Sequence, residues 1–166
     1  QIKVFCPGSV ANVSCGFDVL GFCLEPVGDI MSVTKTVTPG VTIGTISGQD
    51  LPKDPEKNVA SVAVKSLLEA HPSEYGFRID IEKKIKPGSG IGSSAASAAG
   101  AVFAVNELIG RPYSRNELIQ FAMAGETLAS GAAHADNLAP VLLGGFTLVR
   151  SNKSLDIIKL PSPPKL

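Results

Sequence analysis

The chain has 166 residues, of which 44% are hydrophobic and 18% charged, and its formal net charge is zero. This length fits one domain, or part of a larger protein, and the apolar content excludes a disordered chain. The zero net charge argues against the strongly basic surface that binds nucleic acids. No apolar run reaches the roughly 18 residues of a membrane span, and no signal-type segment opens the chain.

The cysteines, Cys6, Cys15 and Cys23, all lie near the start of the chain. Their odd number, without a CxxC pair or a Cys/His cluster, argues against both a disulfide framework and a zinc site. We therefore expect reduced thiols and a cytoplasmic protein. The first residue is Gln and the end, PSPPKL, is rich in proline. These features predict a trimmed start and a linker over residues 161–166.

Strands dominate the first part of the chain. A short strand is expected over residues 2–5, followed by a Pro-Gly turn and a loop, and a second strand begins near Phe22. Residues 29–37 and 41–46 alternate well enough to form two strands joined by a Pro-Gly turn.

Helices and strands alternate after that point. Residues 58–70 carry apolar side chains at helical spacing, and residues 77–82, FRIDIE, alternate strictly as a half-buried strand does. A helix is expected over residues 94–109. Ser114 and Glu117 form a capping-box pattern for a helix that runs to about Ala129, with Gly131 as its stop. A strand at 145–149 completes a mixed α and β domain.

The stretch KPGSGIGSS, residues 86–94, places flexible backbone directly before the Ala-rich helix. The first amides of a helix have no internal partner, and the helix dipole is positive there. Glycines allow backbone to approach an anion closely, and Ser93 and Ser94 add hydroxyl groups. The arrangement favours anion binding. The alternative is a purely structural turn into a buried helix.

Two common nucleotide motifs do not fit this stretch. No GK[ST] follows the glycines, so it is not a standard P-loop. Gly88, Gly90 and Gly92 give GxGxG, and Ser93 stands in place of the last Gly of the dinucleotide fingerprint.

Three segments resemble the GHMP kinases, the family of galactokinase, homoserine kinase, mevalonate kinase and phosphomevalonate kinase. PGSGIGSSAA, residues 87–96, is similar to the family's phosphate-binding loop PxxxGxGSSAA. PGSVANVSCGFDVLG, residues 7–21, resembles the PxSxANxGxGFDxLG opening of the homoserine kinases, with Ser14 in place of a Gly. GETLASGAAHADNLAP, residues 125–140, resembles the family's GE…HxDNxAP segment.

The resemblance implies an α+β fold with a left-handed β-α-β unit, of the type found in a ribosomal-protein domain. It implies an ATP-binding N-terminal domain over residues 1–160, with 161–166 starting a linker to a C-terminal domain. It also implies transfer of the γ-phosphoryl group of ATP to L-homoserine with Mg²⁺ as cofactor, a step in threonine biosynthesis. Members of the family often form homodimers, and neither nucleic acid nor membrane is expected as a partner.

The resemblance also assigns the nucleotide and metal sites. Ser94 and Glu126 match the hydroxyl and the carboxylate that hold Mg²⁺, a hard ion that keeps much of its water. Without the resemblance, Glu126 is a solvated helix position, although the adjacent Gly125 suggests a close approach by some neighbour. The triphosphate would be held by the loop and the helix start: Pro87, Gly88, Ser89, Gly90, Ile91, Gly92, Ser93, Ser94, Ala95, Ala96 and Ser97.

Four residues match positions that bind the amino acid substrate, and Asp18 is a suitable partner for its ammonium group. Taken alone, Asp18 could equally cap a turn, and a lone His is more often structural than functional. These four residues are Asn12, Asp18, His134 and Asp136.

Two asparagines have further roles by resemblance. Asn137 stands where mevalonate kinases carry an aspartate proposed as general base, and an amide cannot accept a proton at neutral pH. We count Asn137 among the catalytic residues and expect no strong base, with the hydroxyl passing its proton to the phosphoryl group. Asn58 matches a residue near the adenine, and it is also a suitable helix N-cap.

Lys83, Lys84 and Lys86 precede the loop. They could attract ATP, but a solvated strand edge is the simpler interpretation.

The family pattern has a second half, with a third glycine-rich motif and the arginines that hold the substrate carboxylate. Neither is in this chain, so we expect the isolated chain to be a poor catalyst. The alternatives are a kinase for another alcohol, such as mevalonate or shikimate, a nucleotide-binding module without catalysis, and an RNA-binding domain. The zero net charge and the absence of Trp argue against the last.

Overall fold

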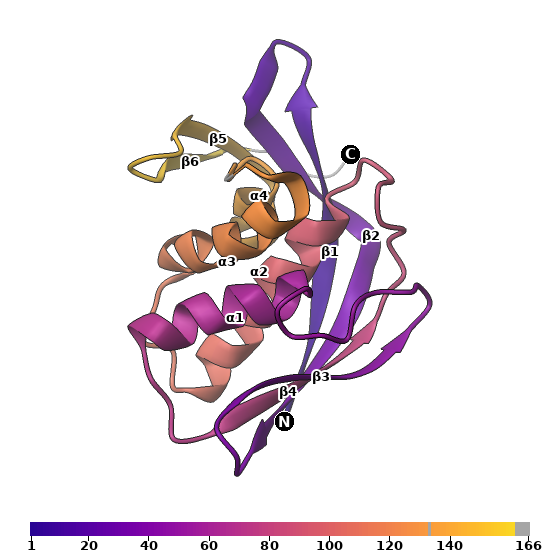
Figure 1. Cartoon of the computed structure of the whole chain (residues 1–166). Helices are drawn as coiled ribbons and strands as arrows, with labels where there is room; N and C mark the ends of the chain where they lie inside the picture. The colour runs from indigo at the N-terminus through magenta and orange to yellow at the C-terminus, as the bar shows by residue number, and fades with distance from the viewer. Residues whose placement is uncertain (133, 162–166) are drawn as a thin grey trace.

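A computed structural model describes residues 1–132 and 134–161. A six-stranded mixed sheet carries the helices on one face (Figure 1). Its longest part is an antiparallel ribbon of β1 (Ile2–Val13) and β2 (Gly16–Thr36). β2 joins two sub-sheets, because one end pairs with β4 (Gly76–Glu82) and the other with β5 (Phe146–Ser151).

The start of the chain differs from the sequence prediction. β1 does not end at residue 5 but continues through Pro7 and Gly8 as far as Val13, and β2 starts at Gly16, not near Phe22. The Pro-Gly pair forms no turn; the pairing register instead shifts between Pro7 and Ser9. Proline is tolerated there because β1 pairs on one side only, so the missing N–H breaks no ladder bond.

The other half of the sheet is a β-α-β unit. β3 (Gly40–Ser47) and β4 are parallel neighbours, and α1 (Val59–Ala70) lies between them in sequence. β6 (Asp156–Leu160) adds an antiparallel edge next to β5, and the sequence did not predict it. The expected α+β class is confirmed.

Helix α2 (Ser93–Leu108) lies at the centre of the helical layer, against α1, α3 (Arg115–Ser130), α4 (Leu138–Leu143) and the β1–β2 ribbon (Figure 1). Its small side chains make this possible. A Cβ atom on Gly100 would lie 2.1 Å from the Cys6 sulfur, so the helix backbone contacts β1 directly. Most of α2 is therefore buried, including all of residues 95–102.

The predicted helix caps are confirmed. Asn58 accepts a hydrogen bond from the Ala60 amide, and Ser114 and Glu117 form both bonds of a capping box. Gly131 ends α3 in the left-handed conformation. The short helix α4 was not predicted, and it contains Pro140. Proline is tolerated in a first helical turn, where no helical bond needs its N–H.

Within the described parts of the chain, no helix is long and apolar enough to cross a bilayer. The linker predicted for residues 161–166 lies outside the described residues from 162 onward.

Candidate active site

The glycine loop faces a cavity of about 500 Å³ between the tip of the β1–β2 ribbon, the start of α2 and the end of α3. Many of the predicted site residues line it: Asn12, Pro87, Gly88, Ser89, Gly90, Gly92, Ser93, Ser94, Ser97, Glu126 and Asn137. Leu51, Val59 and Ala129 add an apolar portion to the wall. The volume suits a small-molecule ligand with both polar and apolar groups.

The loop leaves the first amides of α2 open to this cavity. Gly92 is the N-cap, with φ of 62°, and no side chain caps the helix. A Cβ on Gly92 would lie 2.0 Å from the Ser9 hydroxyl oxygen, so this position requires glycine for both its conformation and its space. The Ala96 amide donates the first helical hydrogen bond, to the Gly92 carbonyl. Amides earlier in the turn have no helical acceptor and are suited to an anion.

Ser94 and Glu126 lie together on the cavity wall. The Ser94 hydroxyl donates a hydrogen bond of 2.9 Å to Glu126 Oε2. The sequence suggested that some group approaches Gly125 closely. That group belongs to the protein itself, because a Cβ on Gly125 would lie 2.5 Å from the Val59 carbonyl oxygen and 3.0 Å from the Ala98 Cβ. Gly125 thus lets α3 approach α1 and α2, which brings Glu126 to Ser94.

Acidic side chains gather at this end of the cavity. Burial raises the pKa of Glu126, as does the charge of Asp136, against the opposing effects of the Ser94 bond and His134. Burial also raises the pKa of Asp136, helped by the charge of Asp18. Carboxylates that are partly desolvated and close to one another attract cations.

The tip of the β1–β2 ribbon holds two predicted substrate residues in a strained conformation. Asn12 and Asp18 both have a φ of 58°, and Asn12 Oδ1 accepts a hydrogen bond of 2.7 Å from the Asp18 amide. His134 Nδ1 lies 3.5 Å from Asp18 Oδ1. The fold therefore joins residues that are more than a hundred positions apart, although Asp18, His134 and Asp136 lie beside the cavity wall and are not part of it.

Asn137 has a fixed orientation in the wall. Its Oδ1 atom accepts a hydrogen bond of 2.9 Å from the Ser9 hydroxyl. This bond leaves the amide N–H groups of Asn137 as the part that can donate to a ligand. Sequence reasoning missed Ser9, which also donates its backbone amide to the Ile91 carbonyl in the glycine loop.

Some predicted nucleotide residues do not line the cavity. Ala95 and Ala96 are fully buried on the core side of α2, and the Ile91 carbonyl is held by Ser9. Asn58 is 3% exposed, and its side chain bonds to the Ala60 amide and the Pro52 carbonyl. The adenine role of Asn58 stays a prediction, while its neighbour Val59 does line the cavity.

The interpretation of Lys83 as part of a solvated strand edge is wrong. Lys84 and Lys86 are exposed as expected, but the Lys83 side chain is 1% exposed and forms an ion pair with Asp29. Burial lowers the pKa of Lys83, against the opposing effects of its hydrogen bond and charge interaction with Asp29. The alternation of the strand contained this signal, because Lys83 follows Phe77, Ile79 and Ile81 on the buried side.

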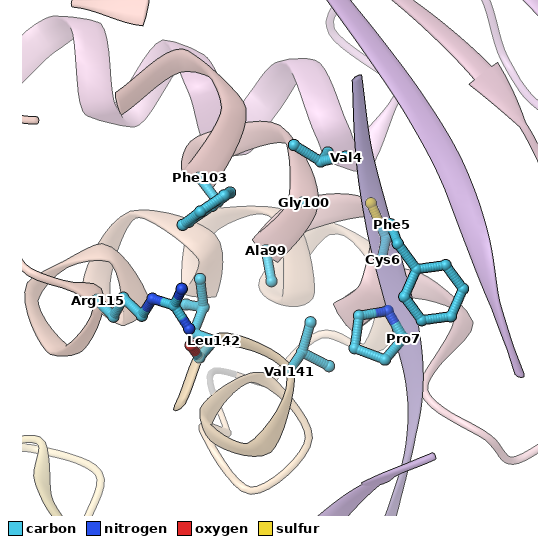
Figure 2. A pocket seen from close by; sticks show the side chains of 10 residues that line it. All are labelled: Val4, Phe5, Cys6, Pro7, Ala99, Gly100, Phe103, Arg115, Val141 and Leu142. Carbon is cyan, nitrogen blue, oxygen red and sulfur yellow. Dashed lines mark hydrogen bonds between the residues drawn. The ribbon is translucent and has the colours of Figure 1, made fainter. Parts of the chain in front are cut away.

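A second cavity, of about 130 Å³, lies between β1, α2 and α4, and Figure 2 shows it lined mainly by apolar side chains. Its one charged group, the Arg115 guanidinium, donates to the Leu142 carbonyl and lies over the Phe103 ring at 5.2 Å. This cavity lacks free polar groups, so the larger one is the candidate site.

A family model described as "GHMP kinases N terminal domain" matches residues 58–145, just over half of the chain. The chain belongs to the GHMP kinase family. The match covers the glycine loop, Ser94, Glu126 and the 134–137 segment of this GHMP kinase domain.

Curated relatives of the GHMP kinase domain include the homoserine kinase of Chlorobium phaeovibrioides, 45% identical over all of this chain and 56% of the relative. The homoserine kinase of Methanococcus maripaludis is 43% identical over 97% of this chain and 54% of the relative. The chain thus spans about half the length of the relatives it matches.

Solved structures show the same fold. The homoserine kinase of Cytophaga hutchinsonii superposes with a TM-score of 0.92 at 51% identity, over 98% of this chain and 52% of that one. Methanococcus jannaschii mevalonate kinase gives a TM-score of 0.74 at 18% identity, over 98% and 56% of the two chains, a likeness in fold alone.

The arginines of this domain are engaged away from the site. Arg78, Arg111 and Arg150 pair with Asp80, Glu107 and Asp156, and Arg115 binds within the helical layer. A carboxylate-binding arginine is therefore missing from the described residues around the cavity.

Proposed function

We propose that the full-length protein transfers the γ-phosphoryl group of ATP to the side-chain hydroxyl of L-homoserine, and that this chain is its ATP-binding domain. The observation that carries the proposal is the cavity that joins the open amides of α2, the Ser94–Glu126 pair and Asn12 at the ribbon tip. The homoserine kinases among the relatives support the choice of substrate.

The phosphates would lie on the glycine loop and the first turn of α2, where amides and the helix dipole favour negative charge. Mg²⁺ would be held by Ser94 and Glu126. These hard oxygen donors fit the ion, and two protein ligands leave room for the water and phosphate oxygens that it prefers. When bound, the ion neutralises charge that builds up on the phosphoryl oxygens.

Homoserine would lie next to the metal site, at the end of the cavity where the acidic side chains gather. Asp18 and Asp136 would offer negative charge to its ammonium group, with His134 beside Asp18, and Asn12 holds the backbone conformation of the tip. Its carboxylate would bind to arginines outside this chain, which is why we expect the isolated chain to be a poor catalyst.

The reaction needs positioning more than a strong base. The amide of Asn137, oriented by Ser9, would donate a hydrogen bond to the reacting oxygen atoms. The homoserine oxygen bonds to the γ-phosphorus as the bond to the β-phosphate oxygen breaks, and the hydroxyl proton passes to a phosphoryl oxygen. We further propose that the protein acts in the cytoplasm, in threonine biosynthesis, and as a homodimer.

An acceptor panel tests the proposal. The full-length protein would be assayed with ATP and Mg²⁺ against homoserine, mevalonate and shikimate, with ADP release as the measurement. We expect homoserine to be the best acceptor by at least about 100-fold in kcat/KM, because a site built for an ammonium group rejects acceptors that lack it. A better rate with another alcohol would reassign the substrate. ATP binding without turnover on any acceptor would leave a nucleotide-binding module.

A further inference from the structure

A buried ion pair lies directly beneath the glycine loop, between the sheet and α2. Asp29 on β2 and Lys83, at the end of β4, are each 1% exposed in their side chains. Lys83 is also one of the residues that line the candidate site. Removing two charges from water costs free energy, and the other contacts of this buried pair show what it holds in place.

All three N–H groups of the Lys83 ammonium have partners. Nζ donates to Asp29 Oδ2, to the Ser93 carbonyl at 2.7 Å and to the Ser97 hydroxyl at 2.9 Å. Three acceptors need three donors, so Lys83 is the charged ammonium in this arrangement. No donor remains for a phosphate oxygen. The contacts of Lys83 are therefore to the first turn of α2 and not to a ligand.

Asp29 binds the other end of the loop. Its Oδ1 atom accepts hydrogen bonds from the Lys84 amide at 2.7 Å and the Ile85 amide at 2.8 Å. These amides lie where the chain leaves β4 and enters the glycine loop. The carboxylate thus fixes the start of the loop, while the ammonium paired with it fixes the end.

A further bond closes the same arrangement, since the Ser93 hydroxyl donates to the Ile85 carbonyl at 3.1 Å. Between these fixed ends, Gly88 and Gly90 have positive φ and no neighbouring atom close to their Cβ positions. A loop of this kind has many conformations available unless its ends are held.

We propose that Asp29 and Lys83 are positioning residues for nucleotide binding, which join the two ends of the glycine loop so that its amides face the phosphates. The inference rests on the proposed function, because it assumes a triphosphate on the loop. Neither residue touches the reacting atoms. The pair acts by holding the start of α2 against the end of β4, so that ATP does not have to order the loop when it binds.

The test uses the full-length protein with both charges removed, Lys83→Met with Asp29→Asn. Replacing both partners of a buried pair is far better tolerated than removing one, which leaves an unpaired buried charge. The Asn oxygen can still accept from the Lys84 and Ile85 amides, but the link to Ser93 and Ser97 is lost. The matched control, Lys3→Met with Glu82→Gln, removes an exposed Lys–Glu pair that includes the end of β4.

We expect the double variant to have a KM for ATP that is raised between about 10-fold and about 100-fold, as misplacement of a binding group by around 1 Å produces. The KM for homoserine should change by less than about twofold, because the ribbon tip is untouched. Thermal unfolding shows whether the variant is folded at the assay temperature. If it is not, Ser97→Ala removes one acceptor of Lys83, and it should raise the KM for ATP by about threefold to tenfold.

Three outcomes overturn the inference. A folded double variant with an unchanged KM for ATP would show that the pair serves stability alone. Equal increases in the KM values of both substrates, or the same increase in the Lys3/Glu82 control, would show a general loss of structure. Absence of turnover in the unmodified full-length protein would instead overturn the proposed function itself, so the two failures are distinguishable.

Discussion

The hydroxyl of Ser94 donates a hydrogen bond to the carboxylate of Glu126, although 32 positions separate them in sequence. One residue belongs to the first turn of α2 and the other to the third quarter of α3, and each helix is fixed by its own packing. The bond therefore depends on how closely the two helices approach each other.

Glu126→Gln tests the metal role in the full-length protein. The amide keeps the shape of the side chain and its acceptor for Ser94, but it removes the negative charge that Mg²⁺ needs. We expect kcat to fall by at least about 100-fold, as loss of charge stabilisation at a reaction centre does. The melting temperature should change little. The exposed Glu69→Gln on α1 is the control, and unaltered turnover in the Glu126 variant would contradict the metal assignment.

Gly125→Ala tests the approach of the helices. The added methyl group would lie 2.5 Å from the Val59 carbonyl oxygen, which is backbone and cannot move aside. We expect a loss of about 1–3 kcal/mol in the free energy of unfolding, measured by urea denaturation, despite the better helix propensity of alanine. Gly110→Ala, where the methyl group meets no atom but φ is 95°, separates backbone strain from crowding. A larger loss at Gly110 would be contrary to this account.

The capping box of α3 gives a stability prediction. Ser114→Ala removes the side chain that accepts from the Glu117 amide, and we expect it to cost about 1 kcal/mol. Urea denaturation of the single variant is the measurement. A change close to zero would show that the box contributes nothing to α3.

The same box predicts a pH dependence. Hydrogen bonds from the Ser114 hydroxyl and then from its amide lower the pKa of Glu117 below its usual 4.5. A carboxyl whose folded pKa is lowered stabilises the protein above its unfolded pKa and loses that effect as pH falls through the folded value. The stability difference between the unaltered protein and Glu117→Gln should therefore be constant near neutral pH and shrink below about pH 4.5. A difference that grows toward acid would have the wrong sign.

Cysteine reactivity gives a fifth prediction. Burial, with the charge of Asp29, raises the pKa of Cys6 to about 12, so its thiol stays protonated at pH 8. The thiolate is the reactive form. Iodoacetamide should therefore label the exposed Cys15 in the folded protein and leave Cys6 unlabelled until urea is added. Peptide mapping by mass spectrometry gives the result, and early labelling of Cys6 would show that β1 separates from α2.

The sequence predicted those parts of the fold that local physics decides. The strands and helices with clear periodicity, the caps at Asn58 and Ser114, and the open helix start after the glycines all appear in the structure. The sequence prediction ended the first strand too early, because a Pro-Gly pair such as Pro7 and Gly8 is typical of a turn. Only the strand pairing shows that β1 continues as an edge strand. Local pattern cannot supply that information.

The buried Lys83 illustrates a different limit. Its charge suggested a solvated position, and a charged residue is seldom buried without a partner. The alternation of β4 placed Lys83 on the buried side of the strand. Its partner Asp29 is 54 positions away in sequence and comes close to Lys83 only through the pairing of strands in the sheet. The meeting of His134 with Asp18 and the bond between Ser9 and Asn137 are of the same kind. The distance between the two residues of each pair depends on how the β1–β2 ribbon packs over the helices.

Because α2 is enclosed by the rest of the domain, a ligand bound at its start would affect the unfolding of the whole domain. Its middle residues have no solvent-facing side, so a local opening cannot release them one turn at a time. Backbone amides there would exchange with deuterium only in molecules that unfold completely. A nucleotide held at the head of this helix would slow that exchange throughout the core, because its binding free energy adds to the cost of global unfolding.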